Sequence, residues 1–235
     1  ASDVYKRQEG DDSVYVMRVE RRDGVSQLTL AHITPTGTEE LAVLEVASAP
    51  PHVPDVADFR LLADGGSSVN HMPAICVIGS GGDIVLMPVD EEASAPAEVV
   101  GSVDQGILAA AWSPEEDVLV LITGGEKRLI VMTREFEVMS ETMLSTEAFG
   151  DDQPVNVGWG SKSTQFHGSE GKQAAMAAAN APEESDPRGP LVPEDDGLPR
   201  ISWRGDGAFF VTSSAEASHD TVHRILRTYT RTGTL

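Results

Sequence analysis

Ile107-Leu-Ala-Ala-Ala-Trp112, the turn Ser-Pro-Glu-Glu-Asp and the apolar run Val118-Leu-Val-Leu-Ile122 follow one another and decide the fold. The same order recurs where Arg200–Trp203 is followed by Arg-Gly-Asp-Gly and then by Ala208-Phe-Phe-Val211. Two short apolar strands joined by a polar turn form a hairpin, whose faces need neighbours to bury them. The recurrence therefore predicts a stack of similar all-β units.

Three tryptophans mark the repeat, because Trp159 stands 47 residues after Trp112 and 44 residues before Trp203. A period of about 40–45 residues with several short strands is typical of β-propeller blades. We therefore predict an all-β, WD40-like β-propeller. We expect the tryptophans to be structural, with Trp112 and Trp203 in the joints between neighbouring blades, because a large aromatic side chain fixes the spacing of packed units.

Apolar and alternating runs between Gly, Pro and Asp turns give the predicted strands. An N-terminal unit has strands at Ser13–Glu20, Gln27–Ile33 and Leu41–Val46. The first full blade has Ala57–Leu62, Ala74–Ile78, Ile84–Val89 and Glu98–Val103. The second has Ile107–Trp112, Val118–Thr123, Arg128–Thr133 and Glu137–Thr142. A third unit starts at Val155–Trp159, and the last has Arg200–Trp203, Ala208–Ser213 and Val222–Tyr229.

Once the insertion at residues 161–198 is set aside, the length fits about four blades at about 45 residues each, and the last unit lacks a fourth strand. We therefore predict an incomplete propeller over residues 9–235, a fragment of a larger ring. Residues 161–198 are polar and rich in Gly and Pro, which predicts a flexible insertion that is disordered over 176–198. Residues 1–8, Ala-Ser-Asp-Val-Tyr-Lys-Arg-Gln, look like translated sequencing adaptor, so we expect a non-native leader and leave it out of the fold prediction.

The charge balance points to protein partners. Thirty-eight acidic and 17 basic residues give a formal charge of −21, which repels nucleic acid and anionic membranes and suits a basic protein surface. An acidic, solvated rim that only maintains solubility is the simpler alternative. The sequence contains no apolar run of about 18 residues, so it predicts no membrane span. The single cysteine, Cys76, fits a buried strand and a reducing compartment, so we expect a cytoplasmic location, with the nucleus as a second one.

Residues that could carry chemistry form no convincing site. His219 and His223 have an i,i+4 spacing, but they flank the start of a predicted strand, where that spacing does not bring side chains together. We expect them to be surface histidines in a hairpin loop. The stretch Gly168–Lys172 lacks the first Gly and the final Ser or Thr of a phosphate-binding loop. Ser169 with His167 and Glu170 would be a nucleophilic trio only on paper, because neighbours on a flexible loop seldom hold catalytic geometry. We predict no catalytic residue, no cofactor and no metal.

One long block carries a family resemblance. Val157–Ala175, which reads Val-Gly-Trp-Gly-Ser-Lys-Ser-Thr-Gln-Phe-His-Gly-Ser-Glu-Gly-Lys-Gln-Ala-Ala, is unlike ordinary propeller repeats. Together with Asp104–Pro114 and Ile201–Phe210, it resembles the N-terminal propeller of the Elongator complex subunit 1 (IKAP) family. The similarity extends from Asp104 to Thr230 and more weakly from Val14 onward. The Trp-Asp dipeptide of WD repeats is missing, which weakens the WD label.

The resemblance implies a non-catalytic scaffold in a complex that modifies the wobble uridine of tRNA at carbon 5, with the chemistry on a different subunit. It implies other Elongator subunits as partners, and a homodimer formed through a C-terminal region that this chain does not include. Two alternatives stay open: a WD40-like interaction module of an unrelated complex, and a propeller enzyme. A polar loop on a rigid ring is where binding residues collect. The candidate partner-binding loop comprises Thr164, Gln165, Phe166, His167, Gly168, Ser169, Glu170, Gly171 and Lys172.

Overall fold

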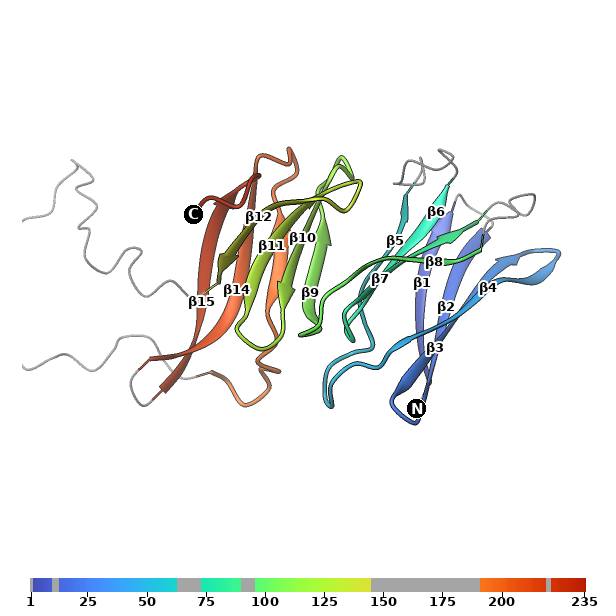
Figure 1. Ribbon diagram of the computed structural model, residues 1–235, viewed down its shortest axis with the longest axis horizontal. Helices are drawn as coiled ribbons and strands as arrows, with labels where there is room; N and C mark the ends of the chain where they lie inside the picture. Colours follow the sequence, from blue (N-terminus) through green and yellow to red (C-terminus); the bar gives the residue numbers. More distant parts are fainter. Residues whose placement is uncertain (1, 10–12, 63–72, 90–95, 145–190, 219–220) are drawn as a thin grey trace, which may run out of the picture.

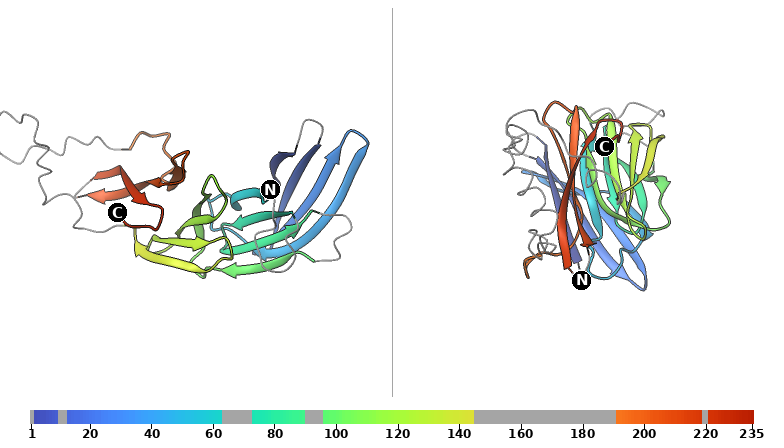
Figure 2. Two further views of the ribbon diagram at one scale, coloured as in Figure 1. Left: turned by 90° about the horizontal axis from the view of Figure 1, so that it is seen from above. Right: turned by 90° about the vertical axis from the view of Figure 1, so that its left-hand side faces the viewer.

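The computed structural model describes residues 2–9, 13–62, 73–89, 96–144, 191–218 and 221–235, and the regular structure in these ranges is entirely β. The strands form four antiparallel sheets that follow the order of the chain, and the sheets stand side by side along the molecule (Figures 1 and 2). The all-β propeller architecture with about four blades is therefore confirmed.

Each sheet is a meander of consecutive strands. The first sheet holds β1 (Ser2–Glu9), β2 (Ser13–Arg22), β3 (Val25–Thr34) and β4 (Gly37–Ala47). The second holds β5 (Val56–Leu62), β6 (Ala74–Gly79), β7 (Asp83–Pro88) and β8 (Glu98–Ser102). The third holds β9 (Ile107–Trp112), β10 (Val118–Thr123), β11 (Arg128–Thr133) and β12 (Val138–Met143). The fourth holds β13 (Arg200–Trp203), β14 (Phe209–Ser218) and β15 (Thr221–Thr230).

The first residues of the chain belong to the first sheet. Ser2–Glu9 forms β1 and pairs with β2 in unbroken antiparallel register, from Ser2 opposite Glu20 to Glu9 opposite Ser13. A segment of this length can satisfy the backbone N–H and C=O groups along the free edge of β2, whatever its side chains are. Residues 1–8 were left out of the fold prediction, and Ser2–Glu9 adds one strand to the first sheet. The non-native origin of these residues stays a prediction.

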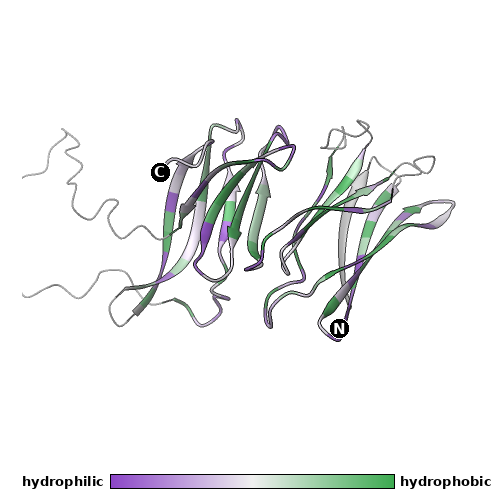
Figure 3. Cartoon of the chain, in the orientation of Figure 1, coloured by the Kyte–Doolittle hydropathy of each residue, from purple (hydrophilic) through white to green (hydrophobic). Residues whose placement is uncertain are grey.

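β6 and the Val118–Ile122 part of β10 are continuous apolar runs because both faces of these middle strands are buried. Side chains alternate between the two faces of a strand. On β6, Ile75 and Val77 pack into the joint with the first sheet, whereas Cys76 and Ile78 pack into the joint with the third. The same split occurs on β10, and the hydrophobic stretches in Figure 3 run along the strands. Burial raises the pKa of the Cys76 thiol well above its usual range, so it stays a neutral core residue.

Two tryptophans occupy matching positions, each at the end of the first strand of its sheet. Trp112 is buried between the second and third sheets, together with Leu62, Cys76 and Leu121. Trp203 is half-buried between the third and fourth sheets, where its Nε1 donates a hydrogen bond to the Ala111 carbonyl oxygen at 3.2 Å. Trp159 lies outside the described residues.

Candidate partner-binding surface

The predicted binding loop, Thr164–Lys172, lies outside the described residues. It belongs to the connection from β12 to β13, and the described ends of that connection can be located. They are Leu144, directly after β12, and the stretch Leu191–Pro199 that leads into β13. The contacts of these two ends define where the connection leaves and rejoins the propeller.

The first end is fixed beside the turn between β10 and β11. Leu144 is buried, and its backbone N–H donates to the Lys127 carbonyl oxygen at 2.9 Å. Lys127 in turn reaches the fourth sheet, because its Nζ donates to the Ala215 carbonyl oxygen at 3.0 Å. This turn therefore holds both the start of the connection and the joint between the third and fourth sheets.

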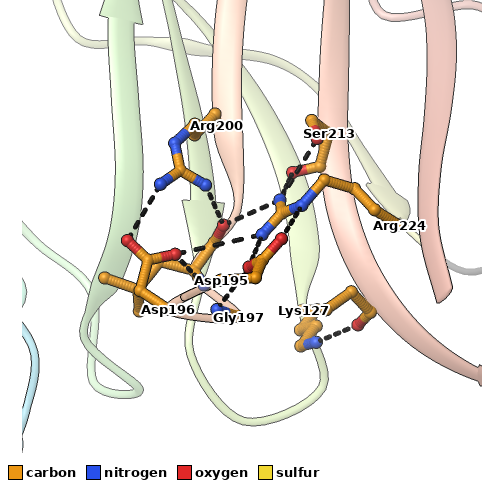
Figure 4. A network of polar contacts seen from close by, with 9 residues as sticks. Lys127, Asp195, Asp196, Gly197, Arg200, Ser213 and Arg224 are labelled. Carbon is orange, nitrogen blue, oxygen red and sulfur yellow. Dashed lines mark hydrogen bonds and ion pairs between the residues drawn. The ribbon is translucent and has the colours of Figure 1, made fainter. Parts of the chain in front are cut away.

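The second end is fixed by a polar cluster on β14 and β15 (Figure 4). The Asp195 carboxylate accepts two hydrogen bonds from the Arg224 guanidinium, from Nε at 2.8 Å and from Nη2. Arg224 Nη1 also donates to the Leu198 carbonyl oxygen and to the Ser213 hydroxyl, both at 3.1 Å. A planar guanidinium that binds a carboxylate through two parallel bonds fixes orientation as well as distance. We name Asp195, Leu198, Ser213 and Arg224 the base clamp.

The base clamp corrects one expectation about the insertion. Residues 191–198 were predicted to be the end of a flexible segment, but the Leu191 N–H donates to the Val222 carbonyl oxygen at 3.1 Å and the base clamp holds Asp195. Composition alone suggested disorder, because this stretch is acidic and contains Pro. The arginine that binds it comes from β15, about 30 residues later in the chain, and local composition cannot show such a partner.

The ion pair changes the electrostatics of its acid. Hydrogen bonds from Arg224, supported by the Gly197 N–H, lower the pKa of Asp195 to about 2. Arg224 itself has a raised pKa because it donates to this carboxylate. Asp196, the next residue, pairs with Arg200 Nη2 at 2.9 Å and lies 3.9 Å from Arg224 Nη2, so Arg224 faces both neighbouring acids.

Acid should release the base clamp. Because the pKa of Asp195 is lower in the folded chain than in the unfolded chain, its contribution to stability is complete above about pH 4 and is lost as the pH falls through about 2. We expect the amide protons of residues 191–198, corrected for their intrinsic rates, to exchange faster across this interval. Asp195→Asn should show the faster exchange already at pH 7. Glu194→Gln, at an exposed acid of the same stretch, is the control and should change little, and equal effects of both variants would contradict the base clamp.

A second ion pair, between Glu216 and Arg227, lies beside the first, and one histidine lies opposite Glu216 on the neighbouring strand. Burial would raise the pKa of Glu216, but hydrogen bonds from Arg227 and Ser214 outweigh this effect and lower it. His223 is opposite Glu216 in the register of β14 and β15 and is only 1% exposed. The prediction of His223 as a surface residue in a hairpin loop was wrong, because the hairpin continues to Ser218 and Thr221. His219 lies outside the described residues.

Sequence reasoning also missed an arginine cluster around the turn between β9 and β10. Glu116 binds Arg60 of the second sheet, from Nε to Oε1 at 3.0 Å, and its carbonyl oxygen accepts from Arg134 at 3.2 Å. Asp117 pairs with Arg231, which follows β15. The acids of this turn therefore connect three sheets. The local sequence could not predict these ion pairs, because the two partners lie up to 114 residues apart in the chain (231 − 117).

The described residues contain neither a group of metal-ligating side chains nor a membrane-spanning helix. Among them, no three or more His, Cys, Asp or Glu side chains are grouped so that they could hold a metal ion. The described part of the chain also contains no helix that is long and apolar enough to cross a membrane.

Comparison with known proteins gives a consistent family signal. A family model described as "ELP1 first N-terminal beta-propeller" matches residues 6–235. Elongator complex protein 1 of Oryctolagus cuniculus is 41% identical over 140 residues, which are 60% of this chain and 10% of that protein. The Schizosaccharomyces pombe protein of the same name is 38% identical over 164 residues, 69% of this chain and 13% of that protein. The Drosophila melanogaster protein of the same name is 43% identical over 147 residues, which are 61% of this chain and 11% of that protein.

The chain spans about a tenth of the length of these curated relatives. Among solved structures, Kluyveromyces lactis Hsv2 is similar over 97% of this chain and 73% of its own, with 11% identity and a TM-score of 0.36.

Proposed function

Because the chain belongs to the Elongator complex protein 1 family, as its first N-terminal β-propeller, we propose that it is a non-catalytic scaffold of the Elongator complex. In this role it supports modification of the tRNA wobble uridine at carbon 5 through contacts with other subunits. The observation that carries the proposal is the family match over residues 6–235, which includes the Thr164–Lys172 loop.

The charge of the chain supports protein partners over RNA. A formal charge of −21 opposes approach to a phosphate backbone and favours basic protein surfaces. Packing supports the same role, because the described sheets bury their broad faces in the joints between them. Turns, connections and outer strands are then what remains for partners. We place the protein in the cytoplasm, with the nucleus as a second location, and expect homodimerisation through a region beyond this chain.

The base clamp and Leu144 support the choice of loop. Leu144 fixes the first described end beside the joint between the third and fourth sheets, and the base clamp fixes the second described end on the fourth sheet. A polar loop on a rigid scaffold is where binding residues collect. The Thr164–Lys172 loop is therefore our candidate for the contact with another subunit.

Alanine at Gln165, Phe166 and His167 in the full-length protein should weaken assembly, because an aromatic anchor and its polar neighbours often carry most of the binding energy. We expect the other subunits to co-purify at about a tenth of their normal level, given about 1.4 kcal/mol lost, and wobble-uridine modification to fall with them. The matched control replaces Glu183, Glu184 and Ser185, from the stretch without a family motif. If the Gln165-Phe166-His167 variant keeps normal levels of co-purified subunits and normal wobble-uridine modification, the assignment of the loop as a binding site is wrong.

A further inference from the structure

The outer strand of the third sheet has a free edge. β12 stands at the end of the order β12-β11-β10-β9 and, within the described residues, pairs with β11 alone. It follows the outer side of the sheet stack (yellow in Figure 2). Along such an edge every second residue presents an unpaired backbone N–H and C=O, which can accept another strand.

β12 carries apolar side chains where edge strands usually carry protective ones. Val138 is 58% exposed, and Met139 and Met143 are 46% and 42% exposed. Natural edges are commonly protected by lysine, proline or a bulge; β12 contains no lysine or proline, and its bulge lies at its first residues. Its bulge makes Met139 the extra residue and leaves Ser140–Met143 as a stretch in regular register. Exposed, flexible methionines are typical of surfaces that adapt to a bound peptide.

The charge around this edge is predominantly negative. Glu135, Glu137 and Glu141 lie on or just before β12. The neighbouring arginines are already engaged: Arg128 binds Glu126 and Glu141 at 2.8 and 2.7 Å, and Arg134 donates to the Glu116 carbonyl oxygen. A partner for the edge must therefore bring positive charge of its own.

We infer that β12 is a docking edge for an extended, basic segment of a partner protein, which adds a fifth strand to the third sheet. The backbone of the segment would pair with Ser140–Met143, and its apolar side chains would cover Val138 and Met139. Lysines or arginines between those apolar residues would face the acids around β12. Strand addition of this kind takes affinity from main-chain hydrogen bonds and specificity from alternate side chains. The inference rests on the proposed scaffold function and adds the chemistry of one partner.

The test measures binding of a labelled peptide, Lys-Val-Lys-Val-Lys-Val-Lys, to the full-length protein by fluorescence anisotropy. Two further peptides separate the possible causes: one with N-methyl groups on alternate backbone amides, which blocks strand pairing, and one with Glu in place of Lys. Val138→Asp and Met143→Asp change exposed residues on the edge, so their folding should be intact. Val192→Asp, at a residue that is 62% exposed outside any strand, is the matched control.

We expect the basic peptide to bind and the N-methylated and acidic peptides to bind at least about tenfold more weakly. Each edge variant should lose about tenfold, and Val192→Asp should lose nothing. Equal binding of the N-methylated peptide, or unchanged binding by both edge variants, would overturn the docking edge. A third outcome is that the protein binds no peptide but associates with itself, and that Val138→Asp abolishes this self-association. That outcome would assign the edge to a second copy of the chain and would also overturn the proposed docking of a basic partner segment. None of these outcomes bears on the Gln165-Phe166-His167 variant, so the two proposals fail separately.

Discussion

Replacing Trp112 with alanine is expected to lower the free energy of unfolding by about 3–5 kcal/mol. The side chain is 3% exposed and lies between two sheets, so its removal leaves a cavity that neither sheet can close alone. Its ring also packs edge-on against Phe136, with centroids 6.0 Å apart, and this contact is lost too. The joint between the second and third sheets should be the weakest point of the variant.

Urea denaturation measures this effect, with unfolding monitored by the circular dichroism of the backbone, because that signal does not depend on the replaced tryptophan. Val138→Ala is the control, because that side chain is largely exposed and should cost no more than about 0.5 kcal/mol. Trp112→Phe should recover part of the loss, since a smaller ring still fills part of the cavity. A cost for Trp112→Ala below about 1 kcal/mol would mean that the tryptophan does not hold the sheets together.

Replacing Gly82 with alanine should cost at least about 3 kcal/mol. Gly82 lies in the turn between β6 and β7 with φ of +119°, and a Cβ there would be 2.1 Å from the Val103 carbonyl oxygen. The Gly82 carbonyl oxygen also accepts a hydrogen bond from the Val103 N–H at 3.0 Å. Any shift that relieves the clash therefore breaks the contact between this turn and the segment that leads from the second sheet to the third.

Gly24 provides a matched control for this prediction. It lies in the equivalent turn of the first sheet, with φ of +86°, but a Cβ there would meet nothing within 4 Å. Gly24→Ala should therefore cost only the backbone strain of about 1–2 kcal/mol. Thermal or urea unfolding of both variants separates strain from close approach. Equal losses in the two variants would show that the Gly82 turn is not packed against its neighbour.

The strands could be predicted from sequence because the stacking of sheets leaves a local signature. β9 and β10 were predicted with their observed bounds, since apolar runs such as Val118–Ile122 reflect burial on both faces. Strand ends depend on pairing, which explains why β14 and β15 extend beyond prediction and bury His223. The strand at Ser2–Glu9 was not predicted because residues 1–8 were set aside as a non-native leader, and its partner is the edge of β2.

The surface could be predicted less well than the core. The base clamp depends on Arg224 reaching Asp195, and the turn after β9 depends on Arg60 reaching Glu116. Such pairs join positions far apart in the chain, so they follow from the stacking of sheets and not from any local pattern. The Thr164–Lys172 loop stays a prediction, because it lies outside the described residues.

We propose that this propeller contacts proteins and takes no part in binding RNA. Crosslinking of the assembled complex with tRNA bound tests it most directly, with an amine-reactive reagent for proteins and ultraviolet light for RNA. We predict amine crosslinks from Lys162 or Lys172 to another subunit, and no tRNA crosslink within residues 6–235. Crosslinks from these residues to tRNA, without any to a second subunit, would contradict the account.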